Sequence, residues 1–200
     1  MGPTVQDDDR QRIALFGGSF DPIHLGHTFL AERAREELEL DRVIFIPAHC
    51  SPFKTKTQRS PAADRLAMVH LAISGFPWAE ASDYEIGRGD TSYSWRTAEH
   101  FLEELGGPDQ ARLFWILGAD QWNSLHHWAE PEKISSALEF IVFHRNGDDL
   151  SEQPDFRGHF VEGTFDASST AVRAGIRAGD RALPVAASVR AYAEEHGLFR

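Results

Sequence analysis

Residues 17–27, GGSFDPIHLGH, combine three glycines, a proline and two histidines directly behind a short apolar run. His24 and His27 are three positions apart, so on a helix they share one face. Two imidazoles on one face can donate hydrogen bonds to phosphate oxygens, and a protonated imidazole adds positive charge. Gly17 and Gly18 allow a sharp turn and leave room for a ligand beside the backbone. The segment therefore predicts a phosphate-binding loop, and the plainer alternative is a glycine turn with two surface histidines.

The loop does not match other nucleotide or metal motifs. It lacks the G-x-x-x-x-G-K-[ST] pattern of a P-loop, and its glycines are spaced wrongly for the G-x-G-x-x-G dinucleotide fingerprint. The sequence offers neither paired cysteines nor H-E-x-x-H for zinc, so we predict no metal site made by protein ligands. A helix starting behind the loop adds free N–H groups and a positive dipole end, which favour a phosphate.

The whole chain has the composition of an ordinary globular protein. Its 200 residues are 42% hydrophobic and 26% charged, which suits one domain with a substantial core. The formal net charge of −11 argues against a nucleic-acid-binding protein, although a few basic side chains can still hold a small anionic substrate. The single cysteine, the polar and acidic start MGPTVQDDDR and the lack of an apolar run of about 20 residues predict a cytoplasmic protein with no membrane partner.

Apolar runs and helical patterns alternate along the chain. Strands are predicted at 12–16, 42–47, 79–86, 113–117, 139–144 and 159–163. Helices are predicted at 28–39, 61–74, 94–105, 169–178 and 185–196, and residues 145–158 have the composition of a mobile loop. Apolar strands between helices indicate a parallel sheet covered on both faces.

We therefore expect an α/β fold, a single Rossmann-like, doubly wound domain over 12–200 with a mostly parallel sheet flanked by helices. Residues 1–11 are expected to form a disordered tail. Such folds bind ligands at the carboxyl ends of strands, near the point where the strand order reverses. The loop 17–27 follows the first strand, so it lies where a ligand site is expected.

GGSFDPIHLGH resembles the signature of the HxGH nucleotidyltransferase superfamily, whose members transfer a nucleoside monophosphate from ATP or CTP to a phosphate group. The resemblance implies that His24 and His27 contact the triphosphate and stabilise the charge that develops during transfer. The superfamily's second signature, a Ser- or Thr-led segment with a basic residue at a helix start, resembles SSTAVR at 168–173. There the hydroxyl side chains can cap a helix and leave N–H groups for phosphate, with Arg173 one turn further on; a plain capped helix is the alternative.

From about residue 12 to its end the chain is similar to the bacterial nicotinate-mononucleotide adenylyltransferases, which make deamido-NAD from ATP and nicotinate mononucleotide. The segments that carry the similarity are IPAHCSPFK, DRLAMVHLAI, TSYSWRT, ILGAD, HHWAE and the ending LPVAASVRAYAEEHGLFR. The similarity implies direct in-line attack of the mononucleotide phosphate on the α-phosphorus of ATP. It also implies Mg²⁺ as cofactor, bound mainly through the ATP phosphates.

The resemblance assigns the candidate site residues to three groups. The expected catalytic residues are His24, His27 and Arg173. ATP is expected to contact Gly17, Gly18, Ser19, Phe20, Gly26, Gly118, Asp120, Ser169 and Thr170. Nicotinate mononucleotide is expected to contact Lys54, Thr91, Tyr93 and Trp128. The plain alternatives are a turn residue for Asp120, a solvated side chain for Lys54 and core packing for Trp128.

The chain departs from that family's pattern at several positions near the mononucleotide and the ATP loop. Phe53 replaces a histidine, Ser51 a proline, Ala129 a tyrosine and Asn146 a proline. The acceptor therefore stays open, with nicotinamide mononucleotide or pantetheine phosphate as alternatives and a non-catalytic nucleotide-sensing module as another. A class I aminoacyl-tRNA synthetase also carries an HIGH-type motif, but this chain has no KMSKS-like segment and no room for a tRNA-binding domain.

Overall fold

A computed structural model of the chain describes residues 9–52, 60–163 and 165–200. The strands are β1 (Gln11–Gly18), β2 (Arg42–Pro47), β3 (Ala79–Ala81), β4 (Ala111–Gly118), β5 (Glu139–His144) and β6 (Gly158–Glu162). The helices are α1 (Leu25–Glu37), α2 (Ala62–Ile73), α3 (Tyr84–Arg88), α4 (Ser94–Glu104), α5 (Ala119–Trp122), α6 (Pro131–Ala137), α7 (Ser169–Ala178) and α8 (Ala187–Glu195), with a 3₁₀ turn η1 (Leu125–His127). Of the predicted site residues, Lys54 lies outside the described ranges.

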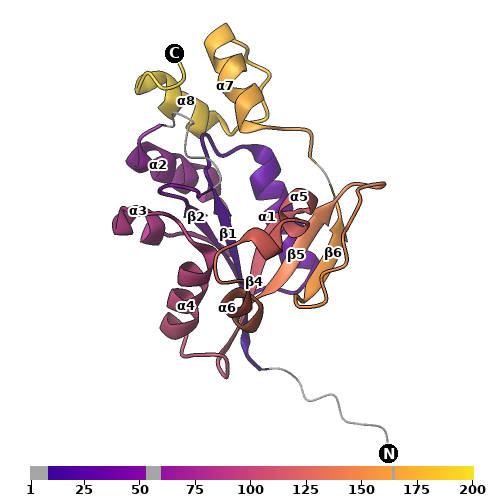
Figure 1. Cartoon of the computed structure of the whole chain (residues 1–200). Helices are drawn as coiled ribbons and strands as arrows, with labels where there is room; N and C mark the ends of the chain where they lie inside the picture. Colours follow the sequence, from indigo (N-terminus) through magenta and orange to yellow (C-terminus); the bar gives the residue numbers. More distant parts are fainter. Residues whose placement is uncertain (1–8, 53–59, 164) are drawn as a thin grey trace, which may run out of the picture.

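Within those ranges the strands form one sheet in the order β3-β2-β1-β4-β5-β6, and each neighbouring pair is parallel. This is the strand order of a doubly wound sheet, and it confirms the predicted fold class. The order reverses between β1 and β4, so the carboxyl ends of these two strands flank the expected ligand crevice. Figure 1 shows the sheet between its helices, with α7 and α8 at one end of the molecule and α8 beside α2.

Apolar side chains project from both faces of the sheet, because successive residues of a strand point to opposite sides. In β1, Ala14 and Phe16 face a core layer shared with α1, α2, α7 and α8. Ile13 and Leu15 face the other layer, which is shared with α4, α5 and α6. The two layers explain why the strands read as continuous apolar runs.

Two predicted elements differ from the structure at their ends. The predicted strand 79–86 is wrong beyond Ala81, because Tyr84–Arg88 forms α3 and Gly89 ends that helix in the left-handed conformation at φ 70°. An alternation of apolar and polar residues over so few positions does not separate a strand from one helical turn. At the amino end β1 begins at Gln11, whose N–H donates to Gln110 O at 2.9 Å, so the last residue of the predicted 1–11 tail belongs to the sheet.

The short helices between β4 and β5 have no counterpart in the sequence prediction. α5 and α6 contain 4 and 7 residues, too few for the 3.6-residue period to repeat clearly. The predicted helix at 28–39 starts earlier, at Leu25, which places His24 at its N-cap. None of the helices in the described part of the chain is long and apolar enough to cross a membrane.

Candidate functional site

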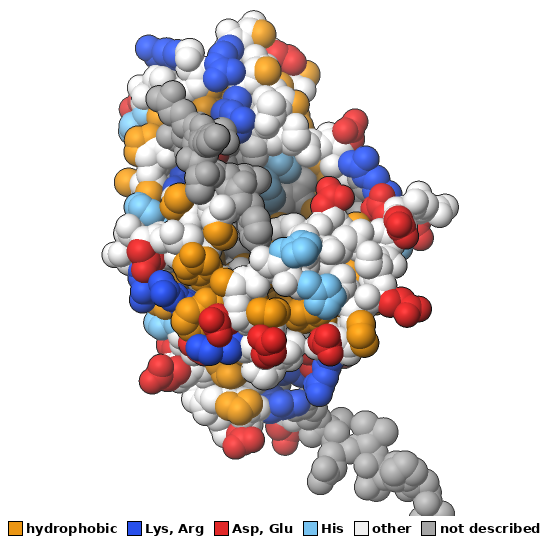
Figure 2. Space-filling model, viewed as in Figure 1, with side chains coloured by type: hydrophobic (Ala, Val, Ile, Leu, Met, Phe, Trp, Pro, Cys, Tyr) orange, Lys and Arg blue, Asp and Glu red, His pale blue; other side chains and the backbone are white. Residues whose placement is uncertain are grey.

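A cavity of about 640 Å³ opens where β1 and β4 end, at the reversal of the strand order. The predicted site residues in the described part of its wall are Gly17, Gly18, Ser19, Phe20, His27, Tyr93, Gly118, Asp120, Trp128 and Ser169. The predicted residues that do not line it are His24, Gly26, Thr91, Thr170 and Arg173. Figure 2 shows histidine side chains gathered near the middle of this view of the surface.

His27 presents a hydrogen-bond donor to the cavity. The backbone N–H of His24 donates to His27 Nδ1 at 3.1 Å, and the His27 N–H donates to the His24 carbonyl at 2.9 Å. Because Nδ1 accepts, the neutral ring of His27 carries its hydrogen on Nε2. The first turn of α1 contains no acidic residue, so its N-terminal dipole is not offset there.

His24 lies behind His27 and supports it. The two rings stack with centroids 3.7 Å apart and an interplanar angle of 28°, and His24 is only 9% exposed. Burial lowers the pKa of His24 to about 4, so this ring is neutral at pH 7. Gly26 makes the packing possible, because a Cβ there would lie 3.0 Å from His24 Nδ1 and 3.2 Å from Phe165 Cδ1. Gly26 thus serves the packing of the loop.

The segment 168–173, which resembles the superfamily's second signature, makes hydrogen bonds to the backbone of the loop 17–27. Arg173 Nη1 donates to the Asp21 carbonyl at 2.6 Å, and Ser169 Oγ donates to the Pro22 carbonyl at 2.9 Å. Thr170 Oγ1 accepts from Arg173 Nη2 at 3.1 Å, which fixes the guanidinium. Arg173 therefore contacts the loop backbone in this structure, and Ser169 is the residue of this group that reaches the cavity wall.

Arg65 supports the same loop and was not predicted as a site residue. Its side chain is 2% exposed and donates to the Ser19 carbonyl at 2.8 Å and to the Ser60 carbonyl at 3.2 Å. The signal was present, since an arginine in the otherwise apolar helix pattern DRLAMVHLAI must find buried acceptors.

Trp115 is a second residue that the sequence prediction missed, and it lines the cavity. It packs against the glycine turn so closely that a Cβ at Gly17 would lie 2.6 Å from Trp115 Cζ2. Its ring also meets Trp128 edge to face, with centroids 6.3 Å apart at 83°. Trp115 thus joins the two predicted halves of the site, the glycine loop and the aromatic wall. In the sequence it looks like one more apolar residue of the strand LFWIL.

A further part of the cavity wall is formed by Ser92, Tyr93 and Ser94 at the start of α4. Thr91 does not line the cavity. Its backbone forms a β-bridge with Cys50, and the Ser92 N–H donates to the Cys50 carbonyl at 2.9 Å. The N-terminus of α4 lies at this wall, and because its first turn has no acidic residue, the positive end of the helix dipole is not offset there.

A buried carboxyl, Glu85, completes this wall. It is 6% exposed and accepts a hydrogen bond from Thr97 Oγ1 at 2.7 Å. Burial raises the pKa of Glu85, while hydrogen bonds from Ser92 and Thr97 oppose that rise. The described residues contain no group of three or more His, Cys, Asp or Glu side chains that could hold a metal ion.

The cavity wall therefore combines candidate phosphate donors with aromatic rings. His27 and the N-terminus of α1 can hold an anion, and Trp128 and Tyr93 can contact a planar ring. Most of the wall is apolar or aromatic, which is typical of a small-molecule site with a few orienting polar groups.

Comparison with known proteins identifies the family of the chain. The chain matches the cytidylyltransferase-like family over residues 15–175. It is 35% identical over 196 residues to the probable nicotinate-nucleotide adenylyltransferase of Opitutus terrae, covering 94% of this chain and 98% of that protein. A relative of the same name from Treponema pallidum is 40% identical over 131 residues, and the match spans 66% of this chain and 64% of that protein.

A solved structure shares the fold. The nicotinic acid mononucleotide adenylyltransferase of Plasmodium falciparum, complexed with NaAD, superposes with a TM-score of 0.77 over 95% of this chain and 98% of that one. The sequence identity of that pair is 16%, so the likeness speaks for the fold.

Proposed function

Because the chain belongs to the cytidylyltransferase-like family, and within it to the nicotinate-nucleotide adenylyltransferases, we propose that it transfers the adenylyl group of ATP to nicotinate mononucleotide. The products are deamido-NAD and pyrophosphate. The observation that supports this most directly is the cavity at the strand-order reversal, with His27, Trp128 and Tyr93 in its wall. The Plasmodium falciparum structure of the same fold is complexed with NaAD, the dinucleotide that this reaction forms.

On the donor side, the triphosphate of ATP lies over the loop from Gly17 to Phe20 and the N-terminus of α1. The His27 Nε2–H and the free N–H groups of the helix donate to the phosphate oxygens. These donors are fixed before the reaction by the His24 backbone and the Arg173 contact to Asp21. Preorganised donors stabilise the charge that builds up as pyrophosphate leaves.

On the acceptor side, the pyridine ring lies against Trp128, and its carboxylate accepts from backbone N–H groups at the start of α4. The acceptor phosphate is already anionic, so it attacks the α-phosphorus in line without a strong general base. One P–O bond forms while the bond to pyrophosphate breaks, and no covalent enzyme intermediate is needed.

We propose that Mg²⁺ enters with ATP as part of the substrate, held mainly by phosphate oxygens and water. When bound, it would neutralise part of the phosphate charge. Asp120, at the cavity end of β4, would be a candidate to hold a water of that ion, because this acidic residue lines the cavity.

A second acceptor, nicotinamide mononucleotide, has one observation in its favour. Glu85 is a carboxyl group in the wall beside Ser92, and an ionised carboxylate there prefers a neutral amide to a second carboxylate. The raised pKa of Glu85 weakens this argument, because a protonated Glu85 tolerates the acid.

The test is pyrophosphate release from purified protein with ATP and Mg²⁺, using nicotinate and nicotinamide mononucleotides in separate reactions. We expect a clear preference in kcat/KM for nicotinate mononucleotide. A preference for nicotinamide mononucleotide would keep the reaction and change the acceptor. Folded protein that binds ATP but turns over neither acceptor would contradict the proposal and favour another acceptor or a sensing role.

A further inference from the structure

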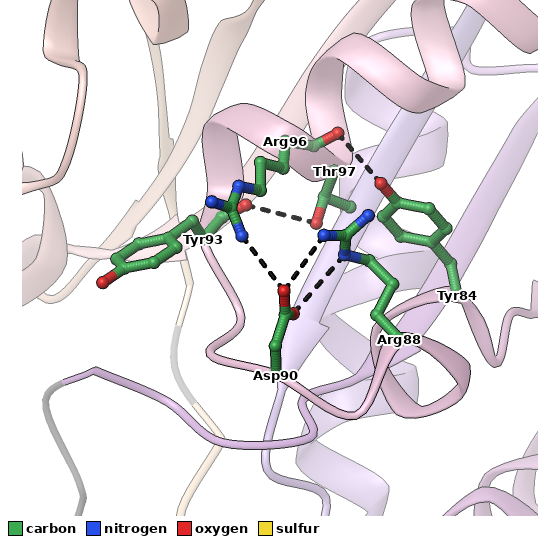
Figure 3. Close-up of polar contacts among 6 residues, drawn as sticks. All are labelled: Tyr84, Arg88, Asp90, Tyr93, Arg96 and Thr97. Atoms are coloured by element: carbon green, nitrogen blue, oxygen red, sulfur yellow. Dashed lines mark hydrogen bonds and ion pairs between the residues drawn. The ribbon is translucent and has the colours of Figure 1, made fainter.

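A charged cluster of Arg88, Asp90 and Arg96 lies beside the acceptor wall. Asp90 Oδ2 accepts from Arg88 Nη2 at 3.0 Å and from Arg96 Nη1 at 3.1 Å, and Oδ1 accepts from Arg88 Nε at 3.4 Å. Arg88 is the last residue of α3 and Arg96 lies in the first turn of α4. One carboxylate therefore ties two helices together across the loop that leads to Tyr93, as Figure 3 shows.

The cluster reaches the cavity through Tyr93. The Arg96 guanidinium lies over the Tyr93 ring at 5.3 Å and over the Trp95 ring at 5.1 Å. Tyr93 is the N-cap of α4 and lines the cavity. Its carbonyl accepts from Thr97 Oγ1 at 3.4 Å, and Tyr84 Oη donates to the Arg96 carbonyl at 3.5 Å, so this turn is also held from the α3 side.

Asp90 also keeps two like charges together. Arg88 and Arg96 bind the same oxygen atom, so their guanidinium groups lie close to each other. Without the carboxylate between them, the two cations repel. Hydrogen bonds from Arg88 lower the pKa of Asp90, so the carboxylate is charged at neutral pH.

The cluster contributes little to the stability of the fold. The side chains of Asp90, Arg88 and Arg96 are 42%, 40% and 35% exposed, and ion pairs in such positions are screened by water. Its effect is therefore local, on the direction of Arg96 and the ring beneath it.

We propose that Asp90 is a positioning residue for the acceptor mononucleotide: it holds Arg96 against Tyr93 and thereby fixes the acceptor wall. The inference rests on the proposed function, because it takes this wall as the mononucleotide side of the cavity. The donor side is built by other elements, β1, α1 and α7.

The test is Asp90→Asn, which removes the charge and keeps the side-chain size. We expect the KM for nicotinate mononucleotide to rise roughly tenfold, as a small misplacement of a binding group does, while the KM for ATP and the Tm stay at wild-type values. The matched control is Glu80→Gln, which removes the similarly exposed ion pair with Arg42 (3.0 Å) at the amino end of β2, opposite the cavity. This control is expected to leave both KM values unchanged.

A rescue variant separates positioning from a general structural effect. Adding Arg88→Gln to Asp90→Asn removes the repulsion between the two guanidinium groups, so the KM for nicotinate mononucleotide is expected to fall part of the way back toward the wild-type value. An unchanged KM in Asp90→Asn, an equal rise of both KM values, or a double variant no better than the single one would overturn the proposal.

A failure of the proposed function has its own signature. Wild-type protein that forms no product contradicts that function, and the role of Asp90 is then decided by calorimetric binding of nicotinate mononucleotide alone. Weaker binding by Asp90→Asn than by wild type supports the positioning role, and equal binding by the two proteins rejects it.

Discussion

His24 and His27 carry the same ring in different surroundings, and their surroundings give them different tasks. His27 faces the cavity, and its Nδ1 accepts from the His24 backbone, so its Nε2–H is the donor for phosphate. His24 is buried, neutral and stacked on His27. Two histidines with one spacing thus divide into a donor and its support.

The donor role predicts the kinetics of His27→Ala. The loss of one preorganised donor to developing charge removes about 2–4 kcal/mol of transition-state stabilisation, a drop of roughly 10²–10³ in kcat. Single-turnover measurements at saturating ATP check this, with circular dichroism as the control for folding. Near-normal turnover in folded His27→Ala would show that His27 is not the donor to phosphate.

The buried ring of His24 predicts a pH dependence of stability. Its folded pKa of about 4 is below the ordinary value of 6.5, so the unfolded chain takes up the proton first as the pH falls. The contribution of His24 to the free energy of unfolding is therefore complete above pH 6.5. It decreases by about 1.4 kcal/mol per pH unit as the pH falls from 6.5 toward 4. Urea unfolding at pH 7, 6 and 5 is expected to show a wild-type decline that His24→Asn lacks. If the unfolding free energies of wild type and His24→Asn changed with pH by the same amount, this prediction would be wrong.

At the scale of elements, the site depends on a contact between an N-terminal loop and a C-terminal helix. The loop before α1 and the start of α7 are joined by Arg173 with Asp21 and by Ser169 with Pro22, residue pairs separated by 152 and 147 positions. Both hydrogen bonds end on backbone carbonyls of the loop. α7 therefore sets the position of the loop, and through it the position of His27.

The α7 contact predicts that Arg173→Met acts on the ATP side. The loop loses its anchor at the Asp21 carbonyl, so we expect the kcat/KM for ATP to fall by about tenfold or more. Arg177→Met, an exposed arginine one turn further along α7, is the matched control and is expected to behave like wild type. Equal kinetics for the two variants would mean that the anchor is dispensable.

At the scale of the whole molecule, the two ends of the sheet have separate tasks. The cavity occupies the carboxyl ends of the strands, whereas a polar cluster joins β4, β5 and β6 at their amino ends. There Arg112 donates to both carboxylate oxygens of Glu139 at 2.8 and 2.7 Å, and His159 Nε2 lies 2.7 Å from Glu139 Oε2. Burial opposes the charge of Glu139, but the hydrogen bonds outweigh it and lower the pKa to about 2.

This cluster predicts a loss of acid stability in Glu139→Gln. A depressed carboxyl pKa stabilises the fold above the ordinary value of 4.5, and the contribution disappears as the pH falls toward 2. We expect the variant to be less stable at pH 7 by on the order of 1–2 kcal/mol, with a difference that narrows below pH 4.5. Thermal unfolding at pH 7 and pH 3 measures the difference in stability between the variant and the wild type. The substitution is not expected to affect turnover. A constant gap at both pH values would contradict this account.

The sequence by itself determined the parts of the molecule whose causes are local. Apolar runs between helical patterns predicted the parallel sheet, and the strand 42–47 and the helix 169–178 have the predicted bounds. The spacing of the glycines and histidines in 17–27 predicted a phosphate loop, and His27, Gly17 and Gly18 do line the cavity. Backbone propensity, periodicity and turn chemistry act between near neighbours, so they can be read from the chain.

Only the tertiary structure decided which distant side chains meet. Arg173 reaches the Asp21 carbonyl, the backbone of Thr91 pairs with that of Cys50, and Trp115 packs between Gly17 and Trp128. The sequence signals for these residues were ambiguous, because an arginine on a helix or a tryptophan in an apolar strand suits many surroundings. Contacts between residues far apart in the chain follow from how the layers pack, and packing is a property of all the elements together.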